Sequence, residues 1–329
     1  MEERQVSDRV FETGPGVYRI SVPTPFAVGD ANVYVLDGPR LAVIDSGVKQ
    51  NSDQIRAALV AIGRTISDVE AIFLTHSHVD HAGAAALLSA HSGARVYLSP
   101  VGHRRLIDPA GRLNEDLPAL AAFLAASGLS EETIANHRHY YGFFLRYGEP
   151  FPSPEPVSDG AWVEAAGHRL KVLATPGHSR DHVVYLDEES GVLFAGDHVL
   201  PHITANPIME RRDPGEGPTL VTYQESLRRV ASLEVRLACP GHGRPFEDVA
   251  GRCREIIQHQ TERCERVFEL LRDRGSATRK DLAIALFGKR PLSEVFLTLS
   301  EVQAALEVLM EDGRVTVRKV NDVEHFCPA

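Results

Sequence analysis

The first hundred residues alternate between short apolar runs and amphipathic segments. The runs rich in β-branched residues, which predict strands, lie at 17–22, 31–37, 40–47, 69–76 and 94–100. Residues 51–63 and 82–93 instead have the apolar spacing of helices, and each segment ends at a glycine. Alternation of strands with helices favours a layered α/β architecture.

Residues 101–156 interrupt this alternation. Two helices are expected there, at 117–130 and 130–148, and the second is rich in aromatic residues. A proline-rich stretch at 149–160 follows and predicts a stiff connector. Strand patterns then resume at 169–179, 182–200 (a hairpin) and 235–243. We therefore interpret 101–156 as a helical insertion into an α/β domain.

Beyond about residue 250 the pattern becomes mainly helical. Three helices and a strand-like ribbon are expected at 253–275, 278–288, 300–313 and 314–326. Thr278 and Asp281 have the spacing of a capping box, and Ser300 is expected to cap the third helix. Three helices followed by a ribbon are the outline of a winged-helix module. We therefore divide the chain into domains at 1–250 and 251–329.

The composition is that of an ordinary folded protein, with 43% hydrophobic and 24% charged residues in a chain of 329. No run of about 18 apolar residues occurs, so no membrane span is expected. The first ten residues lack the basic and apolar pattern of a signal peptide. The four cysteines include no C-x-x-C pair, which favours reduced thiols and a cytoplasmic location.

The charge is unevenly distributed along the chain. Residues 251–329 contain 13 Lys and Arg and 13 Asp and Glu, so the formal net charge of −10 lies entirely in residues 1–250. The expected helix at 300–313 contains four acidic residues and no Lys or Arg, which disfavours contact with phosphates. We therefore expect a small-molecule substrate rather than nucleic acid, and a lid or homodimer role for the C-terminal domain.

Side chains that bind metals follow four of the predicted strands. They are His76, His78, Asp80 and His81, then His178, then Asp197, and finally His242. Each alone is more typical of a turn or a helix cap, but the ends of neighbouring strands meet at one edge of a sheet, so together they predict a metal site. Nitrogen and oxygen donors without thiolate favour zinc, with iron or manganese as alternatives. The set exceeds the needs of one tetrahedral ion, so two divalent ions are expected.

Five segments resemble the metallo-β-lactamase-fold superfamily of hydrolases: "VIDSG" (43–47), "THSHVDHAG" (75–83), "TPGHSRDH" (175–182), "FAGDHVL" (194–200) and "PGHG" (240–243). The resemblance implies a four-layer αβ/βα sandwich with the metals at one edge. The C-terminal outline is similar to the winged-helix-like domain of the lactamase-B2-like members, some of which cleave RNA.

The resemblance also implies roles for individual residues. It assigns His76, His78 and His178 to one ion, and Asp80, His81 and His242 to the other. Asp197 would bridge the two ions. Asp45 and His182 would hydrogen-bond to the ligands and hold their orientation.

The reaction that follows from this resemblance is hydrolysis by a metal-bound hydroxide, with Asp80 and Asp197 as catalytic carboxylates and Asp80 passing a proton to the leaving group. A small organic ester, thioester or lactone is the favoured substrate. Two alternatives are a metal-dependent endoribonuclease or phosphodiesterase, and a mononuclear-iron oxidoreductase similar to persulfide dioxygenases.

Substrate contacts are expected from two regions near the metals. The loop after Asp197 offers His202 and Asn206, and the helical insertion offers Arg138, Tyr140 and Tyr141. A packed helical arm with solvated polar side chains is an equal alternative for the insertion.

Overall fold

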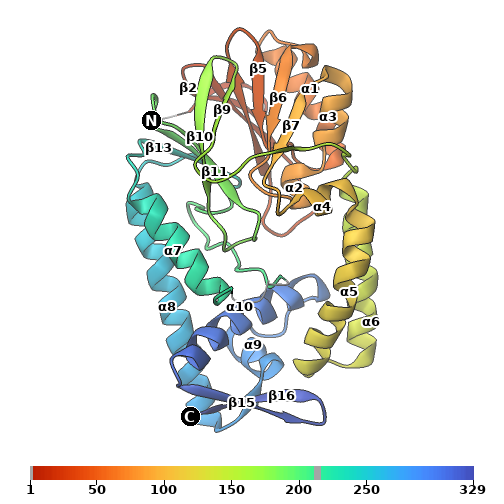
Figure 1. The fold of residues 1–329 in the computed structure, drawn as a ribbon, viewed down its shortest axis with the longest axis vertical. Helices are drawn as coiled ribbons and strands as arrows, with labels where there is room; N and C mark the ends of the chain where they lie inside the picture. Colours follow the sequence, from red (N-terminus) through yellow and green to blue (C-terminus); the bar gives the residue numbers. More distant parts are fainter. Residues whose placement is uncertain (1–2, 211–215) are drawn as a thin grey trace.

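The computed structural model describes residues 3–210 and 216–329, and its upper part in Figure 1 contains two facing sheets. Within the described residues, the first sheet has eight strands in chain order: β1 (Arg4–Ser7), β2 (Val10–Gly14), β3 (Val17–Val22), β4 (Ala31–Asp37), β5 (Leu41–Ile44), β6 (Val69–Phe73), β7 (Arg95–Leu98) and β8 (Glu155–Pro156). Strands β1 to β5 pair antiparallel, and β5 to β8 pair parallel.

The second sheet has the order β13-β12-β11-β10-β9, from β9 (Trp162–Ala165), β10 (His168–Ala174), β11 (Val183–Asp187), β12 (Val192–Gly196) and β13 (Leu237–Pro240). The two sheets bury a shared core. Its aromatic centre contains Tyr34 against Phe194 and Phe73 against Tyr185, each pair with ring centroids 5.6 Å apart. The predicted strands on both sides of the insertion therefore form one packed unit.

Helices cover the outer face of each sheet. The first sheet is covered by α1 (Ser52–Ala61) and α3 (Ala85–Ser92), whose buried residues Ile55, Leu59 and Leu88 pack on strand residues such as Val43. The second sheet is covered by α7 (Thr219–Ala231) and the first turns of α8 (Val249–Arg274). These layers confirm the predicted four-layer α/β sandwich. Short helical segments η1 (Lys49–Asn51), η2 (Ile66–Asp68) and α2 (Val79–Ala82) lie in the connections.

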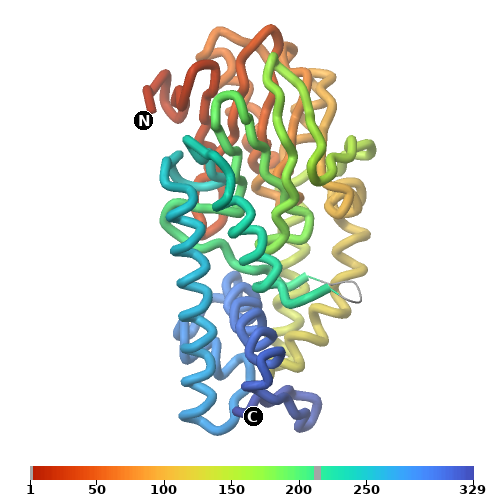
Figure 2. Tube along the Cα trace, turned by 60° about the vertical axis from the view of Figure 1, so that its left-hand side comes forward, coloured from red at the N-terminus to blue at the C-terminus, as the bar shows by residue number. Residues whose placement is uncertain are grey.

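The helical insertion contains α4 (His103–Ile107), α5 (Pro109–Ala126), α6 (Glu131–Phe144) and η3 (Leu145–Tyr147). Figures 1 and 2 show α5 and α6 along one side of the molecule and α8 along the other, with the C-terminal residues at the far end from the sandwich. Leu120 and Leu124 of α5 are buried in the same apolar cluster as Leu271 of α8 and Phe296 of the C-terminal part. The insertion therefore shares a hydrophobic core with the C-terminal helices.

The C-terminal part contains β14 (Ala277–Thr278), α9 (Arg279–Phe287), α10 (Leu292–Glu311), β15 (Val315–Val320) and β16 (Val323–Pro328), with sheet order β14-β16-β15. The capping box at Thr278 and Asp281 is confirmed. The helix boundary predicted at Ser300 is wrong, because α10 begins just after Pro291 and Ser300 lies buried in its middle. Helix, helix and ribbon follow α8 in the predicted order, and the winged-helix comparison stays an interpretation.

Shortening Leu124 to alanine is expected to destabilise the protein by about 2–5 kcal/mol, because Leu124 is fully buried where the insertion meets the C-terminal helices. Urea unfolding measures this change. Val60→Ala is the control, since Val60 is 67% exposed on α1 and should change stability by less than about 0.5 kcal/mol. Equal effects of the two substitutions would contradict a shared core.

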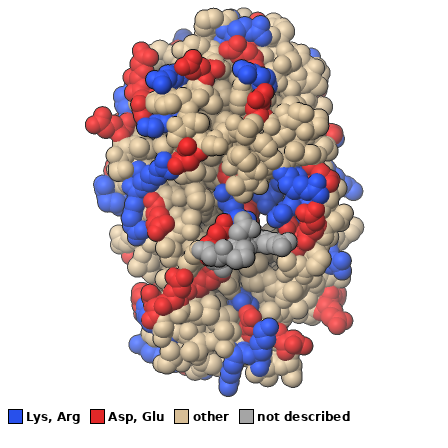
Figure 3. Space-filling view, in the orientation of Figure 1, with Lys and Arg blue, Asp and Glu red and all other residues tan. Residues whose placement is uncertain are grey.

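Among the described residues, no helix combines the length and the apolar character that crossing a bilayer requires. The longest described helix, α8, has a polar face and buries only one side. Charged side chains of both signs are interspersed over the face that Figure 3 shows.

Candidate metal centre

The candidate ligands follow strands of both sheets. The loop after β6 provides His76, His78, Asp80 and His81, and α2 begins within it. His178 lies after β10, Asp197 directly follows β12, and His242 lies two residues after the end of β13. Ligand atoms from these four segments form groups in which all members lie within 4.8 Å of one another. The structure therefore brings the two halves of the predicted site together.

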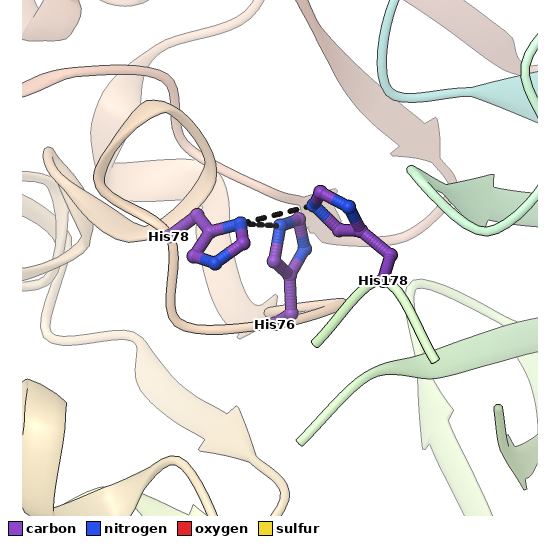
Figure 4. A group of neighbouring side chains, drawn as sticks. All are labelled: His76, His78 and His178. Carbon is purple, nitrogen blue, oxygen red and sulfur yellow. Dashed lines mark hydrogen bonds between the residues drawn. The ribbon is translucent and has the colours of Figure 1, made fainter. Parts of the chain in front are cut away.

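Three histidines form the first group. His78 Nδ1 lies 2.9 Å from His76 Nε2 and 3.1 Å from His178 Nε2, and Figure 4 shows the three rings turned toward a common point. Nitrogen ligands about 2.0–2.1 Å from one tetrahedral ion are roughly 3.3 Å apart. The three nitrogens thus have nearly the separations that a shared ion requires.

Asp80, His81 and His242 form the second group. Asp80 Oδ2 lies 3.6 Å from His242 Nε2, and Asp80 Oδ1 lies 4.0 Å from His81 Nε2. Both imidazoles are almost fully buried, whereas the Asp80 side chain is 14% exposed. The carboxylate of Asp80 is therefore the member of this group that solvent reaches most easily.

Asp197 lies between the two groups. Its Oδ1 is 3.4 Å from His81 Nε2, and its Oδ2 is 3.6 Å from both His178 Nε2 and His242 Nε2. One carboxylate thus approaches imidazoles of both groups: Oδ2 lies near His178 and His242, and Oδ1 lies near His81. This is the geometry that a bridging ligand would have.

The other ring nitrogen of each of four candidate ligands is held by a hydrogen-bond acceptor. His81 Nδ1–H donates to Asp45 Oδ2 (2.9 Å), and His76 Nδ1–H donates to Thr75 Oγ1 (3.0 Å). The backbone carbonyls of Asn206 and Asp30 accept from His178 (2.9 Å) and His242 (2.8 Å). Because Nδ1 carries the proton, Nε2 of each ring keeps a free lone pair directed into the site.

Asp45 hydrogen-bonds to both Thr75 and His81 from a strained backbone conformation. Its φ is 60°, in the left-handed region that residues with a side chain seldom occupy. In this conformation its carboxylate accepts from the Thr75 backbone N–H (2.8 Å) and hydroxyl (2.9 Å) as well as from His81. The predicted positioning role of Asp45 therefore has a direct geometric basis, and strain of this kind is common at functional sites.

His182 contacts the site through the backbone. Its Nε2 accepts from the Asp197 backbone N–H (3.1 Å), so its Nδ1 donates to the Thr175 hydroxyl (2.9 Å). Gly196 makes this contact possible, because a Cβ there would lie 2.7 Å from both His182 Nε2 and Thr75 Oγ1. His182 thus supports Asp197 through its main chain.

Three of the candidate ligands, His76, His78 and Asp197, have pKa shifts that favour the form that binds a metal. Burial and the neighbouring imidazoles hold the pKa of His76 well below its usual value and lower the pKa of His78 to about 3. Burial opposes ionisation of Asp197, but the imidazoles of His242 and His81 hold the pKa of this carboxyl well below its usual range. Neutral imidazoles and ionised carboxylates are the forms that bind cations.

Three buried polar atoms of the site have no hydrogen-bond partner among the described residues: His81 Nε2, His242 Nε2 and Asp197 Oδ1. Buried polar atoms without partners are costly, at about 1–3 kcal/mol each. All three atoms belong to the candidate ligand set and face one another. The donor set therefore fits divalent cations, which would satisfy all three atoms at once.

The residues predicted to contact substrate have different surroundings. His202 and Arg138 are exposed, and Tyr140 is half-buried against Phe144. Tyr141 packs edge-on against Phe296 of α10, with ring centroids 5.7 Å apart. Contacts from these four residues stay predictions. The Asn206 amide donates to α10, and its contact with substrate likewise stays a prediction.

Asp181 and Arg105 were missed by the sequence reasoning. Asp181 Oδ2 accepts from the Ser77 backbone N–H (2.8 Å), so it joins the "TPGHSRDH" loop to the loop that carries His76 and His78. Arg105 of α4 donates to the Ser77 hydroxyl and to Glu210 (both 3.1 Å). Asp181 could have been noticed inside the quoted motif, but Arg105 lies in the insertion and has no local signal.

A family model described as the metallo-beta-lactamase superfamily matches residues 27–242. The chain therefore belongs to this superfamily. A probable metallo-hydrolase of Bacillus subtilis (strain 168) is 32% identical over 314 residues, which are 92% of this chain and 95% of the relative. The chain is accordingly a metallohydrolase, and the match extends through the insertion and the C-terminal helices.

Two further comparisons extend these similarities. The crystal structure of a metallo-beta-lactamase family protein from Thermus thermophilus is similar over 96% of this chain and 99% of that chain, with a TM-score of 0.83 and 30% identity. An atrochrysone carboxyl ACP thioesterase of Aspergillus fumigatus is 27% identical over 282 residues, 82% of this chain and 72% of that protein. The likeness to solved structures thus spans both the sandwich and the C-terminal helices.

Proposed function

We propose that the chain is a dinuclear-metal hydrolase of small carboxylic esters, thioesters or lactones. The observation that carries this proposal is the position of the Asp197 carboxylate, whose two oxygens lie 3.4–3.6 Å from imidazoles of both ligand groups. His76, His78 and His178 would hold one ion, and Asp80, His81 and His242 the other. Imidazole and carboxylate donors favour zinc, with iron or manganese also compatible.

Divalent ions held in this way activate water at neutral pH and polarise the bond to be cleaved. The chain's own contribution is to fix the ligands through Asp45, Thr75 and the two backbone carbonyls. Asp80 has the solvent access that a proton carrier needs. Burial alone would raise its pKa, but His81 and His242 lower the pKa of Asp80 to about 2. It is therefore an ionised acceptor that can pass a proton to the leaving group.

An aromatic cluster beside the metal-binding loop supports an apolar acyl or aryl group in the substrate. The cluster contains Phe26, Tyr140, Tyr141, Phe143, Phe144 and Tyr147. Phe26 stacks on Phe144 with ring centroids 5.4 Å apart, and Phe143 is 40% exposed. The segment after Tyr147 packs on Val79, because a Cβ on Gly148 would lie only 3.2 Å from Val79 Cγ2. Val79 lies in the sequence between two candidate ligands.

A substrate panel tests the proposal. Metal-loaded protein is offered acyl thioesters, aryl esters and lactones with acetyl or longer apolar acyl groups, together with a phosphodiester. We expect hydrolysis of carbonyl substrates, with kcat/KM at least about tenfold higher for the longer acyl groups because each buried methylene contributes about 0.8 kcal/mol. Turnover of the phosphodiester alone would contradict the proposal and favour the nuclease alternative.

Acidification is expected to release the ion of the Asp80–His81–His242 group before that of the three-histidine group. Burial alone would lower the pKa of His81, but Asp197, Asp80 and Asp45 raise it well above its usual value, and Asp197 and Asp80 likewise raise the pKa of His242. Protons therefore compete with a metal at these imidazoles at higher pH than at His76 and His78, whose pKa values are lowered.

Metal content measured after gel filtration at stepwise lower pH from about 8 to 4 checks this order. Two separate losses are expected, with the ion of the Asp80–His81–His242 group lost at the higher pH. Comparison with Asp80→Asn protein identifies which ion is lost at each step. If the ion of the Asp80–His81–His242 group survived after loss of the other ion, the assignment of pKa shifts to ligand groups would be contradicted.

A further inference from the structure

The segment that follows Asp197 is held by helices of the C-terminal part. In its first half, Arg252 of α8 donates to the backbone carbonyls of Leu200 (2.7 Å) and Ile203 (2.9 Å). Thr204 Oγ1 lies 3.3 Å from His259 Nδ1, also on α8. Residues 200–204 are therefore fixed to a helix outside the two sheets.

In its second half, the segment is fixed to α10 by Asn206. The side-chain amide Nδ2 donates to the backbone carbonyl of Leu297 (2.8 Å) and to Glu301 Oε2 (3.4 Å), two acceptors one helical turn apart. Glu301 also faces Arg263 of α8 at 3.6 Å. A helix carbonyl has a second lone pair available for such a bond, so the amide attaches to α10 without disturbing the helix.

The backbone of the same residue holds a candidate metal ligand. The Asn206 carbonyl accepts from His178 Nδ1–H (2.9 Å), and the Ile208 N–H donates to the His178 carbonyl (3.3 Å). The following side chains, Ile208 and Met209, pack against the core that α5, α8 and α10 share. His178 is thus hydrogen-bonded to residues 206 and 208, in a segment whose position is set by α10.

We propose that Asn206 is a positioning residue through which α10 fixes the orientation of His178. This inference rests on the metal role of His178 in the proposed function. It assigns the C-terminal helices a part in shaping the metal centre: the Nδ2 donor anchors the segment to α10, and the backbone carbonyl of the same residue sets the tautomer and the ring plane of His178. Loss of an outer partner of a metal ligand typically lowers metal affinity by about 10–100-fold.

The test uses the full chain with Asn206→Ala, loaded with Co²⁺ as a spectroscopic probe. We expect Co²⁺ affinity, measured by chelator competition, to fall about tenfold and the visible absorption bands to shift, because the orientation of one ligand changes. Activity is not needed for either reading. The control is Glu294→Gln, which lies on α10 outside this network and loses its ion pair with Arg290, a residue just before the helix (3.4 Å). It should leave both readings unchanged.

Three outcomes are decisive. Wild-type affinity and an unchanged spectrum in Asn206→Ala would overturn the inference while leaving the proposed function intact. Absence of Co²⁺ binding by the wild-type chain would overturn both. Should Asn206→Ala not fold, Glu301→Ala takes its place: visible bands shifted from those of the wild-type chain support the inference, and a wild-type spectrum overturns it.

Discussion

Replacing Asp197 with asparagine is expected to remove hydrolysis and to lower the bound metal. The substitution keeps the shape of the side chain but removes the charge that faces His81, His178 and His242 at 3.4–3.6 Å. Both ligand groups lose their common anion, so the effect should exceed the roughly 10–100-fold loss that follows removal of an outer partner of a ligand. Metal content and kcat/KM of the purified variant measure it.

The matched control is Asp53→Asn on α1, where the side chain is 91% exposed and pairs with Arg56. It makes the same chemical change far from the ligand set and should alter neither metal content nor turnover. The folded state of Asp197→Asn should persist, because the amide retains two polar atoms. Wild-type metal content with wild-type turnover in Asp197→Asn would contradict the role given to this carboxylate.

A single added methyl at Gly241 is expected to have nearly as large an effect. A Cβ there would lie 2.3 Å from Asp197 Oδ1 and 2.7 Å from His81 Cε1. The backbone cannot move aside easily, because Gly241 N–H donates to the Gly196 carbonyl and the Gly241 carbonyl accepts from the Asn32 N–H, both at 2.7 Å. Gly241→Ala must therefore displace two candidate ligands, and metal affinity and turnover should each fall more than about tenfold.

Overpacking of this kind also costs about 1–3 kcal/mol of stability, which thermal unfolding would record. Gly14→Ala is the matched control, since a Cβ at Gly14 meets no atom within 4 Å. If Gly241→Ala bound metal as tightly as Gly14→Ala, the close approach of Gly241 to Asp197 would be refuted.

The sandwich and its ligand loops could be predicted from sequence because their signals are local. Strand patterns and turn residues are adjacent in the chain, and the loop after β6 alone carries four candidate ligands. The convergence of His178 and His242 with them needed the additional rule that ends of neighbouring strands meet at one edge. That rule covers His178, Asp197 and His242, which follow strands of the second sheet, but the loop after β6 belongs to the first sheet. The convergence therefore also depends on the packing of the two sheets, which the sequence did not specify.

The packing of the insertion could not be predicted in the same way. Leu120 and Leu124 show that α5 has an apolar face, but an apolar face does not specify its partner, and here it packs with Leu271 and Phe296. The start of α10 was misplaced for a related reason: Ser300 is a residue type that often caps helices, yet burial in the core places it mid-helix. Tertiary packing overrode the local preference in both cases.

The contact between Asn206 and α10 also lay beyond the sequence. Asn206 and Leu297 are 91 residues apart, and an asparagine before a proline is typical of any turn. Only the folded chain shows that its amide and its carbonyl face different elements, one on α10 and one on His178. This double contact connects the C-terminal helices to the metal centre.

Metal ions and turnover counted on the same preparation decide whether the chain is a dinuclear-metal hydrolase. Metal content by mass spectrometry is measured on the native protein, after chelation and after reloading, with carbonyl-substrate hydrolysis followed at each stage. We expect two divalent ions per chain, loss of turnover when they are removed, and recovery when they return. One iron per chain with oxygen uptake, or undiminished hydrolysis by the metal-free chain, would contradict this expectation.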